Sequence, residues 1–159
     1  MTRGARRPMR KAEREITDPV ELGKILARAE VVFLALHDDP APYVVPLSFA
    51  HADGALWFHC AREGTKLDLI RRDPRVGFSA AADARIAAGP AACDFSTTGS
   101  SVVGRGTAHI VTDPAERRRG LDALARHYGV ENPAYRPESL ARTCVVRIDV
   151  EELRGKRLA

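Results

Sequence analysis

The stretch from Tyr43 to Lys66 constrains the fold more than any other part of the chain. Two runs rich in β-branched and aromatic residues, 43–50 and 56–61, flank an Asp53-Gly54 step. A step of this kind between two strand-like runs is a strong signal for a β-hairpin. The second run ends just before Gly64, where a helical pattern begins. We therefore expect a hairpin wall that leads directly into a helix.

The start of this helix has the features of an anion-binding site. Thr65 is expected to cap the helix, with Asp68 three residues later completing a capping box. The free N–H groups of a helix N-terminus attract phosphate, and the cations of Arg62 and Lys66 lie close by in sequence. Lys66 taken alone would be an ordinary solvated lysine. Beside Thr65 and the hairpin, it predicts a phosphate cup.

Composition limits the class of protein. With 159 residues the chain is expected to form one domain with a core of its own. Its cysteines, Cys60, Cys93 and Cys144, are odd in number and widely spaced, which predicts free thiols in a reducing compartment. The histidines have no metal-ligand spacing, so no metal site is expected. The absence of a membrane-length apolar run or a signal-peptide core predicts a soluble, cytoplasmic protein.

The positive charge is concentrated in an N-terminal arm, residues 1–14. Six basic residues there face one acidic residue, which exceeds the net charge of +4 of the whole chain. The remainder, 15–159, is predicted to be a single domain that is slightly acidic. Such an arm can bind nucleic acid, or it can be a solvated leader that only improves solubility. We expect the second, and no nucleic-acid partner.

The rest of the chain predicts short strands and a few helices. Asp18-Pro19 and Asp113-Pro114 each begin a helix with one apolar face, and Pro46 within a strand pattern indicates a sheet edge or a bulge. Residues 81–92 are too rich in Ala and Gly to assign, whereas Cys93-Asp94-Phe95 resembles a strand fragment. The expected strands are 31–36, 43–50, 56–61, 75–80, 100–112 and 143–150, with a further helix at 66–72 and a helical turn before 143. Six or seven strands with packed helices predict a mainly β fold, an antiparallel barrel.

Several segments, taken in order, resemble a known family. They are Tyr43-Val44-Val45-Pro46-Leu47-Ser48-Phe49, Leu56-Trp57-Phe58-His59-Cys60-Ala61, Gly64-Thr65-Lys66, Asp73-Pro74-Arg75-Val76, Ala92-Cys93-Asp94-Phe95 and Ser100-Ser101-Val102-Val103-Gly104. Over residues 10–156 the chain is similar to the pyridoxamine 5′-phosphate oxidase-like FMN-binding split barrels. The nitroimidazole-resistance (Nim-type) branch is the better match, because it has a similar strand-histidine segment followed by a Gly-x-Lys-Leu-Asp helix start.

The resemblance implies a cofactor, an assembly and a set of binding residues. In the family FMN lies across the interface of a homodimer. Its ring would lie against Val45, Pro46, Leu47, Ser48 and Phe49, and its ribityl chain and phosphate along His59, Cys60 and Ala61. Thr65 and Lys66 would hold the phosphate, and the second subunit would contribute Ser101. The oxidases often have basic residues at both phosphate positions, and Thr65 departs from that pattern, so we expect Arg62 to assist.

The function implied is an FMN-dependent reductase of small electron-poor compounds such as nitroaromatics, with NAD(P)H as a possible donor. Vitamin B6 oxidation is not expected. The true oxidases carry a tryptophan and basic substrate ligands in their C-terminal strand, whereas here the only tryptophan is Trp57 and the last strand has Arg147. His59 is either a catalytic residue that contacts substrate or a structural histidine. Cys60 is more simply a small buried side chain than a redox centre. The alternative function is a non-catalytic carrier or sensor of flavin, deazaflavin or haem.

Overall fold

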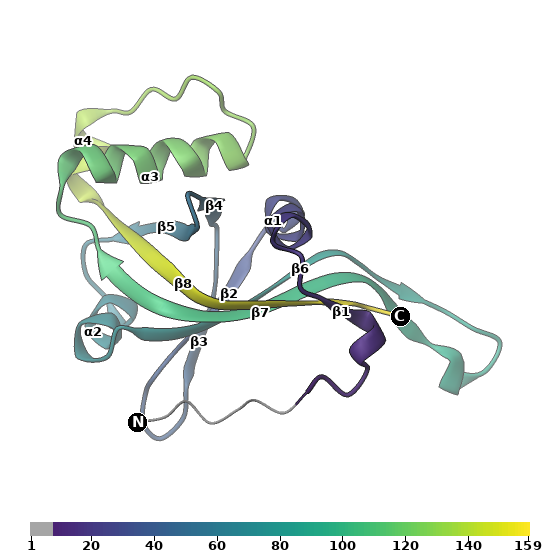
Figure 1. The fold of residues 1–159 in the computed structure, drawn as a ribbon. Helices are drawn as coiled ribbons and strands as arrows, with labels where there is room; N and C mark the ends of the chain where they lie inside the picture. The colour runs from purple at the N-terminus through teal and green to yellow at the C-terminus, as the bar shows by residue number, and fades with distance from the viewer. Residues whose placement is uncertain (1–7) are drawn as a thin grey trace.

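An antiparallel sheet of eight strands forms most of the molecule (Figure 1). We describe residues 8–159 of a computed structural model. Seven strands follow the order β3-β2-β6-β7-β8-β5-β4, and β1 is added to β8. Their bounds are β1 Glu15–Ile16, β2 Val32–Leu36, β3 Tyr43–Leu47, β4 Ala50–Ala52, β5 Ala55–Ala61, β6 Arg75–Ala87, β7 Ser96–Ile110 and β8 Thr143–Arg157. The mainly β architecture predicted from the sequence is confirmed.

The sheet closes on itself without a hydrogen-bonded seam between its two ends. β3 and β4 stand at opposite ends of the strand order, yet only Ser48 and Phe49 separate them along the chain. The three Cα steps from Leu47 to Ala50 span at most about 11 Å, so the two ends of the sheet must lie close together. β3 is thus an edge strand, which is where Pro46, without an N–H, is tolerated. The predicted split barrel is confirmed.

The predicted hairpin is only partly right. Asp53 and Gly54 do form the tight turn, both with positive φ, and they pair Ala52 with Ala55. This turn joins the short β4 to β5, whereas residues 43–47 pair with β2. After β3, at one end of the strand order, the chain crosses to β4 at the other end. Each of these two edge strands pairs its backbone groups with one neighbouring strand.

The strands of the central hairpin are longer than the sequence indicated. β6 continues through the unassigned Ala-rich segment to Ala87, and β7 returns from Ser96 (Figure 1). The strand fragment predicted at 93–95 was wrong. Residues Ala92–Asp94 form a 3₁₀ turn, η2, at the tip of the hairpin, and the Asp94 carboxylate accepts the Ala91 N–H at 3.1 Å.

Four α-helices lie within residues 8–159: α1 Pro19–Arg28, α2 Thr65–Arg72, α3 Pro114–His127 and α4 Pro137–Arg142. The helix starts predicted at Asp18 and Asp113 are confirmed. Asp18 accepts the Val20 N–H at 3.1 Å and Asp113 the Glu116 N–H at 2.7 Å, which satisfies donors that have no partner within the helix. α3 and α4 cover the sheet on one side, and α2 lies below α4 at the left-hand end of the barrel (Figure 1).

Two apolar cores hold these layers together. The first fills the barrel around Leu34, Phe58 and Phe78, and α1 and α2 each bury three side chains in it. The second lies between α3 and β5 around Trp57, Leu121, Leu124 and Val145. α3 approaches closely because Gly120 has no side chain: a Cβ there would lie 2.5 Å from the Trp57 ring. Each large side chain buried in this way stabilises the fold by about 1.5–3 kcal/mol.

The described part of the predicted N-terminal arm is short. Ala12–Arg14 form a 3₁₀ turn, η1, and β1 then pairs Glu15 with Lys156. The Arg154 Nε donates to the Glu15 carboxylate at 2.8 Å, so the chain is attached to β8 where the domain was predicted to begin. Residues 1–7 of the arm lie outside the described residues. Between residues 8 and 159 no helix has the length and apolarity required to cross a membrane.

Candidate functional site

The end of β5 separates two pockets. Phe58 is 1% exposed and packs inside the barrel, and the next residue, His59, points to the opposite side of the strand and is exposed. Cys60 points inward again and packs against the barrel core. Adjacent residues of one strand therefore face different pockets.

The inner pocket, with a volume of about 210 Å³, lies where the phosphate cup is predicted, and we call it the cup. Gly64, with φ 123°, turns the chain from β5 into α2. The lining residues are Tyr43, Cys60, Ala61, Glu63, Gly64, Thr65, Lys66 and Leu67. The predicted residues Cys60, Ala61, Thr65 and Lys66 are thus brought together in one cavity.

The predicted capping box was wrong. Gly64 is the N-cap of α2 and makes no side-chain cap, and the Asp68 carboxylate accepts from Arg71 at 2.9 Å instead. The N–H groups of Leu67 and Asp68 bond to the Gly64 carbonyl. The first turn of α2 therefore has no side chain of its own competing for its outermost N–H groups, which favours an external anion.

The electrostatics of the cup depend on Lys66, Glu63 and Cys60. Lys66 supplies its cation, and Glu63 lines it with a carboxylate. Burial, assisted by the neighbouring Cys144, raises the pKa of the Cys60 thiol to about 11. The thiol is therefore neutral at physiological pH and adds no negative charge that would repel a phosphate.

Arg62 lies outside the cup. Its guanidinium donates to the Ala141 carbonyl at 3.0 Å and lines a neighbouring pocket. Sequence proximity to Lys66 placed it in the predicted phosphate site, but the side chain extends towards α4. The assistance expected from Arg62 at the cup is thus not supported by its position.

The outer pocket lies between the end of β5 and α3, with a volume of about 370 Å³. Two predicted residues, Ser48 and His59, line it together with a mostly apolar wall. The other lining residues are Leu121, Leu124, Ala125, Tyr128, Tyr135, Ser139, Leu140 and Thr143. None of these residues was predicted to belong to the site. The one sequence feature that pointed to them was the apolar face of α3, and such a face is equally typical of a helix packed against the core.

Two tyrosines in the wall of the outer pocket are held by hydrogen bonds. The Tyr128 hydroxyl accepts the Phe49 N–H at 3.0 Å and donates to the Glu30 carbonyl at 2.7 Å. The Tyr135 hydroxyl donates to Asp122 at 2.9 Å, and Arg118 stacks 4.6 Å from the ring centroid. Burial, together with the Asp122 carboxylate, raises the pKa of Tyr135 to about 12, so it is a neutral donor.

The predicted ring-binding strand has two faces. Val45 and Leu47 pack against the barrel core, whereas Pro46 and Ser48 are exposed. Phe49 is fully buried and its ring lies 5.1 Å from that of His127. A flat ligand can therefore contact this strand through Pro46, Ser48 and the backbone.

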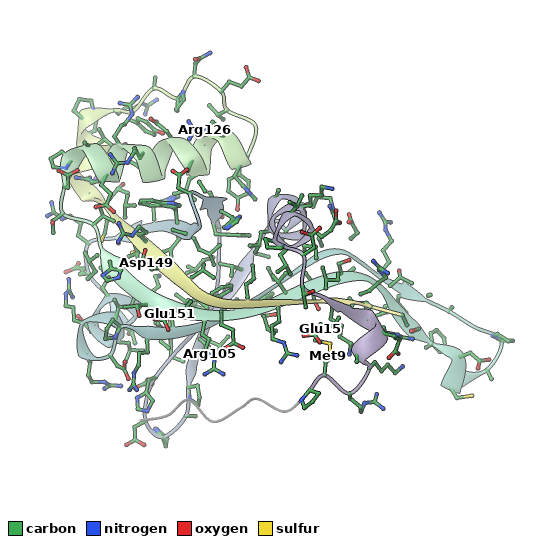
Figure 2. All side chains as sticks on the ribbon, in the orientation of Figure 1. Met9, Glu15, Arg105, Arg126, Asp149 and Glu151 are labelled. Atoms are coloured by element: carbon green, nitrogen blue, oxygen red, sulfur yellow. The ribbon has the colours of Figure 1, made fainter. Side chains whose placement is uncertain are left out.

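The outer face of the sheet beside Pro46 is apolar and exposed. Pro46, Phe33, Ser79 and Val103 are successive register partners across β3, β2, β6 and β7. Phe33 is 48% exposed and Val103 46%. Figure 2 places Arg105, two residues along β7 from Val103, on the side of the sheet away from α3. We call this row, with Val44 beside it, the outer-face patch.

Ser101 lies two residues before Val103 on the same face of β7, and it does not line the cup of its own chain. β7 is three strands from β3 in the sheet, which is roughly 14 Å at the usual spacing of about 4.8 Å. Three strand spacings therefore separate Ser101 from the predicted ring-binding strand within one chain.

Comparison with known proteins decides the family. The profile of the family described as pyridoxamine 5′-phosphate oxidase matches residues 18–157. The chain belongs to the pyridoxamine 5′-phosphate oxidase family. The match covers every element from α1 to β8, including both pockets. No protein with a curated description matches the chain.

Solved structures agree with this family. A Bacteroides thetaiotaomicron protein described as a candidate 5-nitroimidazole antibiotic resistance protein is 26% identical, with a TM-score of 0.79 over 91% of this chain and 86% of that one. A Mesorhizobium loti protein described as FAD-binding is 27% identical, with a TM-score of 0.64 over 92% and 97%. A Mycobacterium smegmatis protein described as binding FAD and haem is 21% identical, with a TM-score of 0.78 over 91% and 73%, and shows the fold alone.

Proposed function

We propose that this protein is an FMN-dependent oxidoreductase that reduces small electron-poor compounds such as nitroaromatics and nitroimidazoles. One observation carries the proposal: His59 and Cys60, adjacent on β5, line an apolar pocket and an anion cup respectively. A cofactor whose phosphate is bound in the cup would have to pass only the end of β5 to reach the outer pocket. The likeness to the Bacteroides thetaiotaomicron protein supports the substrate class.

The residues of the cup fit a flavin phosphate. The uncapped first turn of α2 offers N–H groups, Lys66 offers a cation and Thr65 a hydroxyl, while the neutral Cys60 adds no repulsion. Bound FMN would supply the two-electron chemistry. A single phosphate matches the cup's one lysine and its volume of about 210 Å³, so we propose FMN as the cofactor.

The outer pocket supplies orientation and a proton. Leu121, Leu124 and Leu140 exclude water from one side of a flat substrate and offer apolar contact. The His59 imidazole can hydrogen-bond a nitro or carbonyl oxygen and donate a proton to it as the substrate is reduced. Proton donation by a positioned side chain typically accelerates a reaction about 10²–10⁴-fold.

The proposed site is completed by a second copy of the chain. Ser101 is three strands away from β3 in its own protomer, which supports a flavin that contacts β3 of one protomer and Ser101 of the partner subunit. The outer-face patch offers the apolar surface that such a dimer needs, because Phe33 and Val103 are half exposed on it. We therefore propose a homodimer with FMN at its interface.

A second candidate function is non-catalytic binding of a flavin, a deazaflavin or haem, as a carrier or sensor. It is favoured by the Mesorhizobium loti relative, which is described only as FAD-binding. Both functions use the same cup, and they differ in whether the outer pocket accepts a substrate.

The test combines a spectrum with a turnover assay. The visible spectrum of the purified protein should show an oxidised flavin, and released cofactor should run as FMN in chromatography. Anaerobic NADPH or NADH should then be consumed in proportion to an added nitroaromatic acceptor. A flavin spectrum without turnover with either donor would favour the carrier or sensor function. A Soret band would show that the bound cofactor is haem and not flavin.

A further inference from the structure

Beside the flavin cup lies a second polar pocket, of about 280 Å³. It is found where β7 ends and β8 begins, between α2 and the first turns of α3 (Figure 1). Three of its lining residues are arginines that come from three separate segments of the chain. The full lining is Arg62, Arg71, Ile110, Val111, Thr112, Arg117, Thr143 and Cys144. We call this cavity the arginine pocket.

The arginines carry an excess of positive charge. Arg62 and Arg117 form no ion pair with any carboxylate among residues 8–159. They donate instead to backbone carbonyls: Arg62 to Ala141 at 3.0 Å and Arg117 to Thr143 at 2.8 Å and to Leu140. Carbonyls orient a guanidinium but do not neutralise it, so both retain a full positive charge.

The acidic groups nearby do not cancel this charge. Asp68 is paired with Arg71 at 2.9 Å on the exposed surface of α2. Glu116 binds Arg147, and Asp113 caps the first turn of α3. One carboxylate therefore faces three guanidinium groups. In addition, the Arg117 Nε is buried and has no hydrogen-bond partner among the described residues.

We propose that the arginine pocket binds a phosphate group, as a second anion site separate from the flavin cup. Guanidinium groups bind phosphate through pairs of parallel N–H bonds, and three of them converging on one cavity match a dianion. Thr112 adds a hydroxyl to the lining. The ligand is either free phosphate or the phosphate ester of a nucleotide, since both present the same group.

The site is separate because the two cavities have no lining residue in common. Cys60 lines the cup and Cys144 the arginine pocket, and these two are register partners on β5 and β8. Phosphate binding in the arginine pocket does not depend on flavin chemistry. A protein without flavin would still have the three arginines, and a protein without phosphate affinity could still be a flavin reductase.

The test is calorimetric titration of inorganic phosphate into protein that is loaded with one FMN per chain and freed of unbound FMN, so that the cup is filled and no free phosphate ester competes. We expect saturable binding of one phosphate per chain. The variant Arg71→Ala should weaken phosphate binding at least tenfold, because it removes one of the three guanidinium groups. It should still fold, because Arg71 is exposed and its ion pair is with Asp68 on the surface of α2. Arg62→Ala should act in the same direction. Arg126→Ala is the matched control, since Arg126 is an exposed arginine of α3 outside the pocket (Figure 2).

A parallel titration with AMP identifies the source of the phosphate group. AMP binding tighter than phosphate, and weakened by Arg71→Ala, assigns the pocket to a nucleotide ester. AMP binding no tighter than phosphate assigns it to the free anion. Absence of saturable binding of either probe would overturn the proposal. So would an equal loss in Arg126→Ala and Arg71→Ala, because that reports only general charge screening.

Discussion

The Tyr128 hydroxyl and the Phe49 backbone N–H are joined by a hydrogen bond of 3.0 Å, across 79 residues of sequence. The same hydroxyl donates to the carbonyl of Glu30, just beyond α1. Phe49 belongs to the two-residue crossing between β3 and β4, where the barrel closes without a ladder. Tyr128 therefore supplies a cross-link at the place where the sheet has none, and it also forms a wall of the outer pocket.

Removing this hydroxyl should destabilise the fold. In Tyr128→Phe the ring remains, but the Phe49 N–H and the Glu30 carbonyl lose their partner. We expect a loss of about 1–2 kcal/mol in the free energy of unfolding, measured by urea denaturation. Tyr43→Phe is the matched control, because no hydrogen bond of the Tyr43 hydroxyl is found within the described residues. An equal free energy of unfolding in the two variants would show that the Tyr128 hydroxyl does not stabilise the fold.

Lys66→Ala should weaken flavin binding. The lysine is the only cation that lines the cup among the described residues. A charge-assisted hydrogen bond to phosphate is worth roughly 1.5–3 kcal/mol, so FMN affinity should fall about ten- to a hundredfold in fluorescence titration. Lys24→Ala on the exposed face of α1 should leave affinity unchanged. An unaltered dissociation constant in Lys66→Ala would place the phosphate elsewhere.

His59→Ala separates catalysis from carriage. The side chain is exposed in the outer pocket and does not fill the core, so the variant should keep its flavin. Stopped-flow reoxidation of the reduced flavin by a nitroaromatic should slow about 10²–10⁴-fold. His109→Ala, an exposed histidine beside Asp149, should react as wild type does. Identical rates in all three proteins would make His59 structural.

Phe33→Glu should dissociate the proposed dimer. A carboxylate in the middle of the outer-face patch would be buried there without a partner. We expect the dimer dissociation constant to rise at least about thirtyfold, the equivalent of 2 kcal/mol, in sedimentation analysis. Flavin affinity should fall with it, because in the proposed dimer Ser101 of the partner subunit contacts the flavin. Val20→Glu introduces the same charge at an exposed valine of α1 and should have no effect. A wild-type protein that sediments as a monomer with FMN bound would contradict the dimer.

The three thiols should differ in reactivity at pH 8. With a pKa of about 11, only about one Cys60 thiol in a thousand is ionised, whereas Cys93 is exposed at the tip of the hairpin. Modification with a chromogenic disulfide should show Cys60 reacting about a hundredfold more slowly than Cys93. Cys93→Ser should abolish the fast phase and Cys60→Ser should not. All three thiols should react together in guanidinium, and a fast phase that survives in Cys93→Ser would contradict the assignment.

Local signals in the sequence predicted local structure well. Asp18 and Asp113 cap the helices they were expected to cap, and Asp53-Gly54 forms its turn, because each depends only on neighbouring backbone groups. The capping box at Thr65 failed for a local reason as well. Gly64 adopts a positive φ and takes the cap position itself, one residue earlier.

The sequence did not predict which distant segments pair with one another. Residues 43–47 have the composition of a strand, but nothing within them selects β2 over β5 as the partner. The Ala-rich continuation of β6 to Ala87 has little β propensity of its own and is held by its ladder to β7. Arg62 likewise joins Arg117, 55 positions away, only because β5, β8 and α3 meet at one end of the barrel.

The sequence by itself determined the mainly β class, the helix starts, the family resemblance and the cup around Thr65 and Lys66, since that cup is built almost entirely from consecutive residues. Tertiary structure alone decided the outer pocket and the arginine pocket. Their walls come from strands and helices that are far apart in the chain. Those contacts are fixed by which apolar faces bury one another, α3 against Trp57 above all, and that choice is made by the whole packed chain rather than by any one segment.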